Sequence, residues 1–246
     1  MRQLHPRRRL GVRLHTHLTE TQDEELYCLE KFGRRPLDLM EELEWTGEDV
    51  WYAHGVHFAD AEIPRLGQSG VGIAHCPSSN LRLGAGICRV ADLRRAGVPV
   101  GLGTDGAASN EDYSLSGEIR QAMLVARARE AMQGNLAAAG ALGPGEALAI
   151  ATKGGARVLG RPELGTLEPG RRGDVALYRM DQLGLAGIAD PLLALALAPP
   201  ARAWAVVVEG QVVVRDGRLV KEEEESIARD LTTVSRRLRE VAGHAG

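Results

Sequence analysis

The sequence is poor in the residues that mark several protein classes. Its three cysteines, at positions 28, 76 and 88, form no C-x-x-C pair and are too few for a disulfide framework, which favours a reducing compartment. Aromatic residues make up only 4%, so the core should consist of alanine, leucine and valine. No apolar run approaches the roughly 18 residues of a membrane span or forms a signal peptide. We therefore predict a soluble, cytoplasmic protein with no membrane partner.

A strong charge of either sign is also missing. The formal net charge is -3, which gives no general attraction to nucleic acid or anionic membranes. Arginines at 2, 7, 8, 9 and 13 make the start locally basic, but no basic groove bearing aromatic residues accompanies them. A nucleic-acid binder is therefore the poorest alternative. The length of 246 residues and the 44% hydrophobic content suit one large domain with a sizeable core, or one domain and a small appendage.

Short apolar runs alternate with helix-like segments over the first part of the chain. We expect strands at 10–15, 50–54, 71–75 and 98–103, with helices at 22–33, 36–44, 62–68 and 90–97. Strands separated by helices in this way are typical of right-handed βαβ units and a parallel sheet. The sequence therefore predicts an α/β fold.

The pattern changes after residue 105. We expect helices at 114–131 and 145–160, a strand at 174–178, and two more strands within 203–220 that are joined at 209–210 and turned again at 216–217. These strands indicate a small second sheet. The last segment spaces Ile227, Leu231, Val234, Leu238 and Val241 by four and three residues, which predicts an amphipathic helix packed on an apolar surface.

Each strand of the first part ends near a residue that can bind a metal or carry a proton. These residues are His15 and His17, His54, His75 and Asp105. Carboxyl ends of parallel strands meet at one edge, where such folds place active sites. Imidazole nitrogens and a carboxylate oxygen suit zinc or ferrous iron. Taken singly, each could be a structural residue, such as a turn aspartate, but their joint placement favours a metal site.

Four motifs carry a resemblance to a known family. "HTHLTET", "AHGVHFADAEI", "AHCPSSNLRLGAG" and "VGLGTDGAASN" occur in this order. They resemble the amidohydrolase superfamily, in its cytosine deaminase and triazine hydrolase-like branch, and are most similar to 8-oxoguanine deaminases. The other zinc deaminase pattern, H-x-E before P-C-x-x-C, is absent. The resemblance implies a (β/α)8 TIM barrel, of which this chain carries the second half and part of the small composite β-sheet domain. The expected divisions are residues 1–165 for the half-barrel, 166–220 for the sheet strands and 221–246 for the terminal helix.

The resemblance also implies roles for individual residues. It makes His17 and Asp105 ligands of one divalent metal, with zinc favoured and iron as the alternative, and His54 a further candidate ligand. It makes His54 the group that polarises water or substrate, and Asp105 the acceptor of a proton from the attacking water. It places Glu20 against a ring nitrogen of the substrate as a proton carrier. Residues implied to shape the substrate pocket are His15, His75, Ser78, Ser79 and Asn80.

The implied reaction is metal-dependent deamination of a purine-type ring, with 8-oxoguanine to urate and ammonia as the leading case. Another purine, or a triazine with an amino or chloro substituent, stays open as the small-molecule partner, and the full-length protein is expected to be a homo-oligomer. The family's first strand carries an H-x-H with two further ligands. The only H-x-H of this chain, at His15 and His17, corresponds to the family's fifth strand, so the first-strand ligands have no counterpart in this sequence. We therefore expect a C-terminal fragment. The alternative from another class is an inactive interaction module that pairs its open sheet edges with a partner chain.

Overall fold

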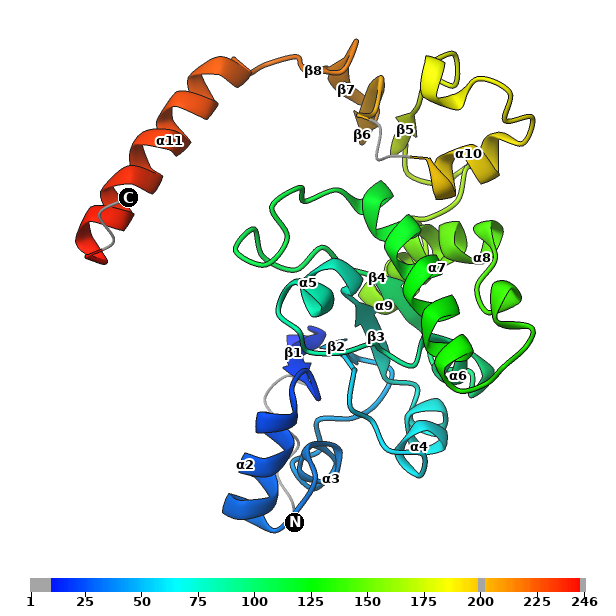
Figure 1. Cartoon of the computed structure of the whole chain (residues 1–246), viewed down its shortest axis with the longest axis vertical. Coiled ribbons are helices and arrows are strands. Elements are labelled where there is room, and N and C mark those ends of the chain that lie inside the picture. Colours follow the sequence, from blue (N-terminus) through cyan, green and yellow to red (C-terminus); the bar gives the residue numbers. More distant parts are fainter. Residues whose placement is uncertain (1–9, 199–201, 244–246) are drawn as a thin grey trace.

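A four-stranded parallel sheet forms the first part of the chain (Figure 1). The computed structural model describes residues 10–198 and 202–243. The strands are β1 (Leu14–Leu18), β2 (Val50–His54), β3 (Gly72–His75) and β4 (Val100–Leu102), and they pair in chain order. The helices between them are α2 (Gln22–Phe32), α3 (Pro36–Glu42), α4 (Glu62–Ser69), α5 (Pro77–Arg82) and α6 (Val90–Arg95). The predicted α/β fold is confirmed.

The hydrophobic core lies between the sheet and its helices. Val50, Tyr52 and Ile73 from the strands are fully buried and belong to the same cluster as Leu66 of α4 and Leu93 of α6. Full burial of an apolar side chain of this size stabilises the folded state by about 1.5–3 kcal/mol. This packing fixes the positions of the strand ends.

The first strand does not begin where the sequence pattern placed it. We predicted a strand at 10–15, but β1 spans Leu14–Leu18. Gly11 adopts a left-handed backbone conformation with φ of 63°, and pairing with β2 starts only at Leu14 opposite Val50. His15 and His17 therefore both lie inside the strand.

Further helices follow the parallel sheet. They are α7 (Leu115–Met132), the 3-10 helix η1 (Ala138–Gly140), α8 (Pro144–Ala149), the π-helical turn η2 (Ile150–Gly154) and α9 (Gly155–Leu159). The η2–α9 junction packs tightly on β4: a Cβ added to Gly154 would lie 2.1 Å from the carbonyl oxygen of Val100. Glycine is needed here for close approach of helix and strand. The helices α5 and α10 (Pro191–Leu197) and the 3-10 helix η3 (Leu183–Leu185) were not predicted from the sequence.

A small antiparallel sheet forms the second part. Its strands are β5 (Val175–Leu177), β6 (Ala205–Val208), β7 (Gln211–Arg215) and β8 (Arg218–Leu219), paired in chain order. The β6–β7 and β7–β8 turns each place two residues at positive φ, namely Glu209 and Gly210, then Asp216 and Gly217. Two successive residues of this kind are the mark of tight hairpin turns. The expected sheet is present, and the division of the chain at residues 165 and 220 stays a prediction.

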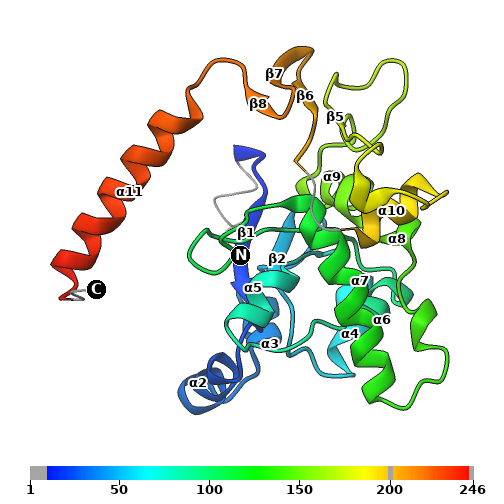
Figure 2. The same cartoon turned by 45° about the horizontal axis from the view of Figure 1, so that its top comes forward.

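The terminal helix α11 (Glu224–Val241) extends away from both sheets (Figures 1 and 2). It is the amphipathic helix that the spacing predicted, but none of its side chains is buried. Leu231 and Leu238 are 65% and 64% exposed. The expected packing on an apolar surface is therefore not seen within the described residues. None of the described helices is long and apolar enough to span a membrane.

Candidate metal centre

Three of the predicted residues converge at the carboxyl edge of the parallel sheet. One ligand atom each from His17, His54 and Asp105 lies within 4.8 Å of the others. They come from β1, from the end of β2 and from the loop after β4. Nδ1 of His17 lies 3.2 Å from Nε2 of His54, which lies 4.0 Å from Oδ2 of Asp105. The sequence-based expectation that the strand ends meet is therefore met in the geometry.

The orientation of His54 leaves one ring nitrogen for the centre. Its Nδ1 lies 2.8 Å from the side-chain oxygen of Asn80, and both residues are buried. Because an amide oxygen only accepts hydrogen bonds, Nδ1 carries the proton and donates it. Nε2 then presents a lone pair toward His17 and Asp105. A buried hydrogen bond to the other nitrogen is the usual way in which a histidine ligand is held.

A fourth polar group lies at the centre. The carboxylate of Glu20 places Oε2 3.8 Å from Nδ1 of His17 and 3.6 Å from Nε2 of His54. Thr19, before it, has a φ of 52°, and its carbonyl accepts the backbone N–H groups of Val56 and His57 at 2.9 and 3.0 Å. The turn that carries Glu20 is thus tied to the loop that follows β2.

Left-handed backbone conformations occur at two of the candidate ligands. His54 has a φ of 73° and Asp105 a φ of 60°. Such values are uncommon outside glycine and cluster at functional sites, where the surrounding structure maintains them. Here they turn the chain at the end of each strand.

The Asp105 carboxylate is held by two hydroxyl groups. Ser79 of α5 and Ser109 of the following loop place their Oγ atoms 2.6 and 3.0 Å from Oδ2 of Asp105. Burial raises the pKa of Asp105, but the hydrogen bonds from Ser79 and Ser109 outweigh it and leave this pKa below its ordinary value. Asp105 is therefore an ionised carboxylate at neutral pH, as a metal ligand requires.

The donor set fits a divalent metal. Two imidazole nitrogens and one carboxylate oxygen are ligands that zinc and iron both accept. Two nitrogens bound to one zinc at about 2.0–2.1 Å in tetrahedral geometry lie about 3.3 Å apart. The separation of 3.2 Å between Nδ1 of His17 and Nε2 of His54 is close to this value.

The other predicted pocket residues fall into two groups. Asn80 and Ser79 contact the centre through His54 and Asp105. His15 lies on the same face as His17 but stacks on Trp51 with ring centroids 3.5 Å apart. Burial and the neighbouring histidines lower its pKa, although its hydrogen bond to the Trp51 backbone opposes them.

The side chains of His75 and Ser78 form no hydrogen bond with His17, His54 or Asp105 among the described residues. His75 is 1% exposed, and burial followed by the charge of His54 lowers its pKa to about 3. Neither of its ring nitrogens has a hydrogen-bond partner among the described residues. The backbone N–H of Ser78 donates to the carboxylate of Glu118 at 3.0 Å. Their assignment to a substrate pocket stays a prediction.

Sequence reasoning missed three residues near the centre. Ser109 and Asn110 lie within the quoted motif "GTDGAASN", so the motif was a signal that could have found them. Glu118 lies on α7, is 1% exposed and accepts from the side chain of Asn110 at 2.8 Å. Burial raises its pKa above the ordinary value. No local pattern marks Glu118, because one of its partners, Ser78, is 40 residues away in the chain.

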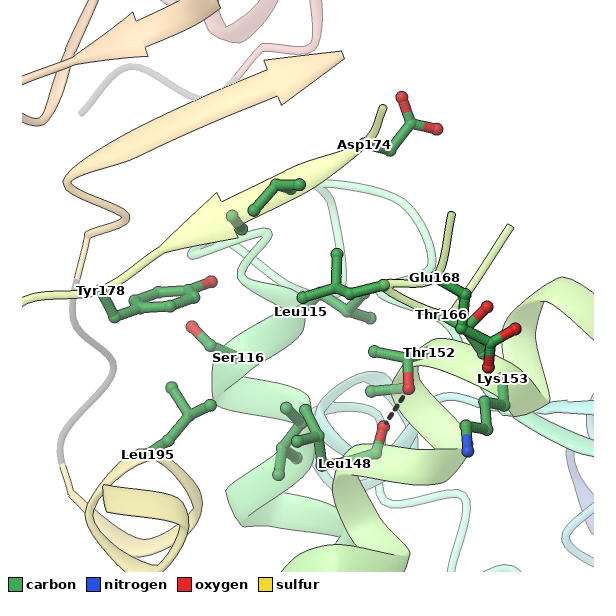
Figure 3. A pocket seen from close by; sticks show the side chains of 16 residues that line it. Leu115, Ser116, Leu148, Thr152, Lys153, Thr166, Glu168, Asp174, Tyr178 and Leu195 are labelled. Atoms are coloured by element: carbon green, nitrogen blue, oxygen red, sulfur yellow. Dashed lines mark hydrogen bonds between the residues drawn. The ribbon is translucent and has the colours of Figure 1, made fainter. Parts of the chain in front are cut away.

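A cavity of about 590 Å³ lies elsewhere, between the small sheet and the helices beneath it (Figure 3). Leu115 of α7, Leu148 of α8, Leu195 of α10 and Tyr178 after β5 are among its lining residues, whereas no candidate metal ligand is. Because none of His17, His54 and Asp105 lines it, this mostly apolar cavity is separate from the candidate metal centre.

Known proteins are similar to this chain in sequence. The Amidohydrolase family matches residues 7–220. An 8-oxoguanine deaminase of Pseudomonas aeruginosa is 48% identical over 209 residues, which are 85% of this chain and 45% of that protein. A 5-methylthioadenosine/S-adenosylhomocysteine deaminase of Desulforudis audaxviator is 41% identical, over 93% of this chain and 52% of that protein. The chain spans about half the length of the curated relatives it matches.

Solved structures are similar to this chain in fold. An adenosine deaminase from Xanthomonas campestris with bound zinc superposes with a TM-score of 0.89 at 29% identity, covering 96% of this chain and 53% of that one. An atrazine chlorohydrolase from Arthrobacter aurescens complexed with zinc gives a TM-score of 0.85 at 37% identity, covering 93% and 49%. Since the family match runs through both sheets and includes the strand ends that bring His17, His54 and Asp105 together, the chain belongs to the amidohydrolase family.

Proposed function

We propose that this chain supplies part of the active site of a zinc-dependent aminohydrolase that deaminates a purine-type ring, with 8-oxoguanine converted to urate and ammonia as the leading case. The observation that carries the proposal is the convergence of His17, His54 and Asp105 within 4.8 Å at one edge of the sheet. Both structural relatives described above carry zinc. The donor set of this chain fits the same metal.

In this proposal His17 and Asp105 hold the metal, and His54 is a further ligand or polarises the reacting groups. When bound, a divalent metal lowers the pKa of water from nearly 16 toward about 7 and so supplies a nucleophile at neutral pH. Water would add to the ring carbon that bears the amino group, and Asp105 would accept the proton that the water loses. Delivery of this proton to the amino nitrogen would then break the carbon–nitrogen bond and release ammonia.

Glu20 is the proposed proton carrier. Its carboxylate lies 3.6 Å from Nε2 of His54, which places it beside the proposed metal centre. In its protonated form, a carboxyl group at this position donates its proton to a ring nitrogen beside the reacting carbon and thereby makes that carbon a better electrophile. Asn80 keeps His54 in the tautomer that presents Nε2 to the reaction. His15, His75 and Ser78 are proposed to shape the pocket around the ring.

The identity to the Pseudomonas aeruginosa enzyme supports 8-oxoguanine as the first substrate to test. The Desulforudis audaxviator relative and the zinc-bound chlorohydrolase bear names with other substrates, so guanine, 5′-methylthioadenosine and a chlorotriazine belong in the same assay. Ammonia release, or chloride release for the triazine, is measured with the zinc-loaded 246-residue chain. The same measurement is repeated with the part of the Pseudomonas aeruginosa enzyme that this chain does not match added in equimolar amount.

Asp105→Asn is the diagnostic variant, and Asp112→Asn is its matched control because Asp112 is an exposed aspartate in the same loop. We expect the unaltered chain to release ammonia. Asp105→Asn should reduce the rate at least a hundredfold, and Asp112→Asn should stay within twofold of the unaltered chain. Chloride release alone would replace the deaminase by a triazine chlorohydrolase. Zinc binding without turnover in either mixture would favour the inactive interaction module.

A further inference from the structure

Glu118 is a buried carboxylate that forms no ion pair with any residue the structure describes. It lies in the first turn of α7 and is 1% exposed, and no lysine, arginine or histidine pairs with it among the described residues. Burying a charged group in this way costs free energy unless hydrogen bonds satisfy it. Glu118 contrasts with Glu130 on the same helix, which is 9% exposed and pairs with Arg95 at 3.3 Å. Helix packing alone does not explain a carboxylate at position 118.

Both oxygens of Glu118 are used, and each holds a different segment. Oε2 accepts the backbone N–H of Ser78 at 3.0 Å, in the first turn of α5. Oε1 accepts the side-chain amide of Asn110 at 2.8 Å, in the loop between β4 and α7. The amide nitrogen of Asn110 also donates to the carbonyl of Thr104 at 2.9 Å. One carboxylate thus joins α5 to the loop that contains Asp105.

These two segments carry the hydroxyl groups that hold Asp105. Ser79 follows Ser78 directly, and Ser109 precedes Asn110 directly. Their Oγ atoms lie 2.9 Å from each other and both contact Oδ2 of Asp105, at 2.6 and 3.0 Å. The two residues that Glu118 contacts, Ser78 and Asn110, are therefore the chain neighbours of both serines that donate to the Asp105 carboxylate.

We propose that Glu118 is a positioning residue for the metal centre: by tying Ser78 to Asn110 it holds the Ser79 and Ser109 hydroxyls on Asp105 and so sets the affinity for the divalent metal. This inference rests on the proposed metal centre. A misplaced ligand weakens metal binding, and loss of groups that orient ligands typically costs 10- to 100-fold in affinity.

The test uses the full chain and Co²⁺, whose visible absorption reports coordination geometry. Affinity is measured by competition with a chromophoric chelator. Glu118→Gln removes one of the two acceptor oxygens, and Glu130→Gln is the matched control, because Glu130 also accepts from an asparagine amide, that of Asn135, at 2.7 Å. We expect a loss of about 10-fold or more in Co²⁺ affinity and an altered spectrum for Glu118→Gln. Glu130→Gln should stay within twofold with an unchanged spectrum.

A double-mutant cycle separates positioning from general destabilisation. If Glu118 acts through the hydroxyl groups, Ser79→Ala and Glu118→Gln together lose little more affinity than either alone, because both remove the same restraint. If the two substitutions acted independently, their fold losses in Co²⁺ affinity would multiply. Asn110→Ala, which leaves α7 unchanged, should reproduce the loss if Glu118→Gln does not fold.

The outcomes distinguish the inference from its foundation. Normal Co²⁺ affinity in both Glu118→Gln and Asn110→Ala, or multiplying losses in the cycle, overturns the role of Glu118 alone. No Co²⁺ binding by the unaltered chain overturns the metal centre and, with it, this role.

Discussion

Replacing Arg35 by alanine should destabilise the chain more than replacing any exposed arginine. Arg35 precedes α3, and its guanidinium donates to both oxygens of Glu62 at 2.9 and 3.2 Å. Glu62 is 2% exposed, whereas Arg35 is 25% exposed. The same guanidinium pairs with Glu25 and donates to the carbonyl of His57 at 3.0 Å.

The expected loss in the free energy of unfolding depends on the hydrogen bonds that Glu62 keeps after the substitution. In Arg35→Ala the buried carboxylate of Glu62 keeps, among the described residues, one hydrogen-bond donor, the backbone N–H of Ala59 at 2.6 Å. Breaking a buried pair by removing one partner costs about 3–5 kcal/mol. Because Arg35 is partly exposed, we expect the lower end, about 3 kcal/mol. The loop that carries His57 should loosen as well.

Urea unfolding followed by circular dichroism measures the effect, and Arg65→Ala is the matched control. Arg65 also bridges two carboxylates, Asp38 and Glu41, but all three side chains are 35–37% exposed. An exposed network of this kind contributes less than about 1 kcal/mol. Equal losses for Arg35→Ala and Arg65→Ala would refute the reasoning from burial. Hydrogen exchange at Val56 and His57 should quicken only in Arg35→Ala.

Three further predictions concern other contacts. His75 has a pKa of about 3 in the folded chain and an ordinary value of 6.5, so between these pH values the unfolded chain binds one more proton than the folded chain. The free energy of unfolding of the metal-free chain should therefore fall as the pH falls from 6.5, by at most about 1.4 kcal/mol per pH unit. In His75→Gln, urea unfolding at several pH values should show a less steep fall. Gly154→Ala should lower the melting temperature by several degrees, since its Cβ would lie 2.1 Å from the Val100 carbonyl oxygen; an unchanged value would contradict the close packing. Asn80→Ala should remove the acceptor of buried His54 and cost about 1–3 kcal/mol in urea unfolding, and no loss would show that Nδ1 needs no partner.

The sequence predicted the parallel sheet because each apolar run is bounded by clear helix signals. It also predicted the convergence of His17, His54 and Asp105, because the ends of parallel strands in chain order must meet at one edge. The predicted start of β1 was wrong, since an apolar run does not reveal where pairing with a neighbouring strand begins. Gly11 was the available clue.

The groups that hold the ligands were harder to predict. α5 has only six residues, too few for a periodic pattern, although Pro77 in its first turn was a helix signal. Glu118 is separated by 40 residues from Ser78, and its role depends on packing between α7 and α5. The exposed face of α11 could not be foreseen either, because spacing predicts an apolar face and not what covers it.

The measurement that tests the central claim most directly is zinc content by elemental analysis of the purified 246-residue chain, compared with His17→Ala. We expect close to one zinc per chain, lost in His17→Ala while the folded structure is kept. A folded chain that binds no zinc, or zinc that His17→Ala retains in full, would contradict the assignment of His17, His54 and Asp105 as a metal centre.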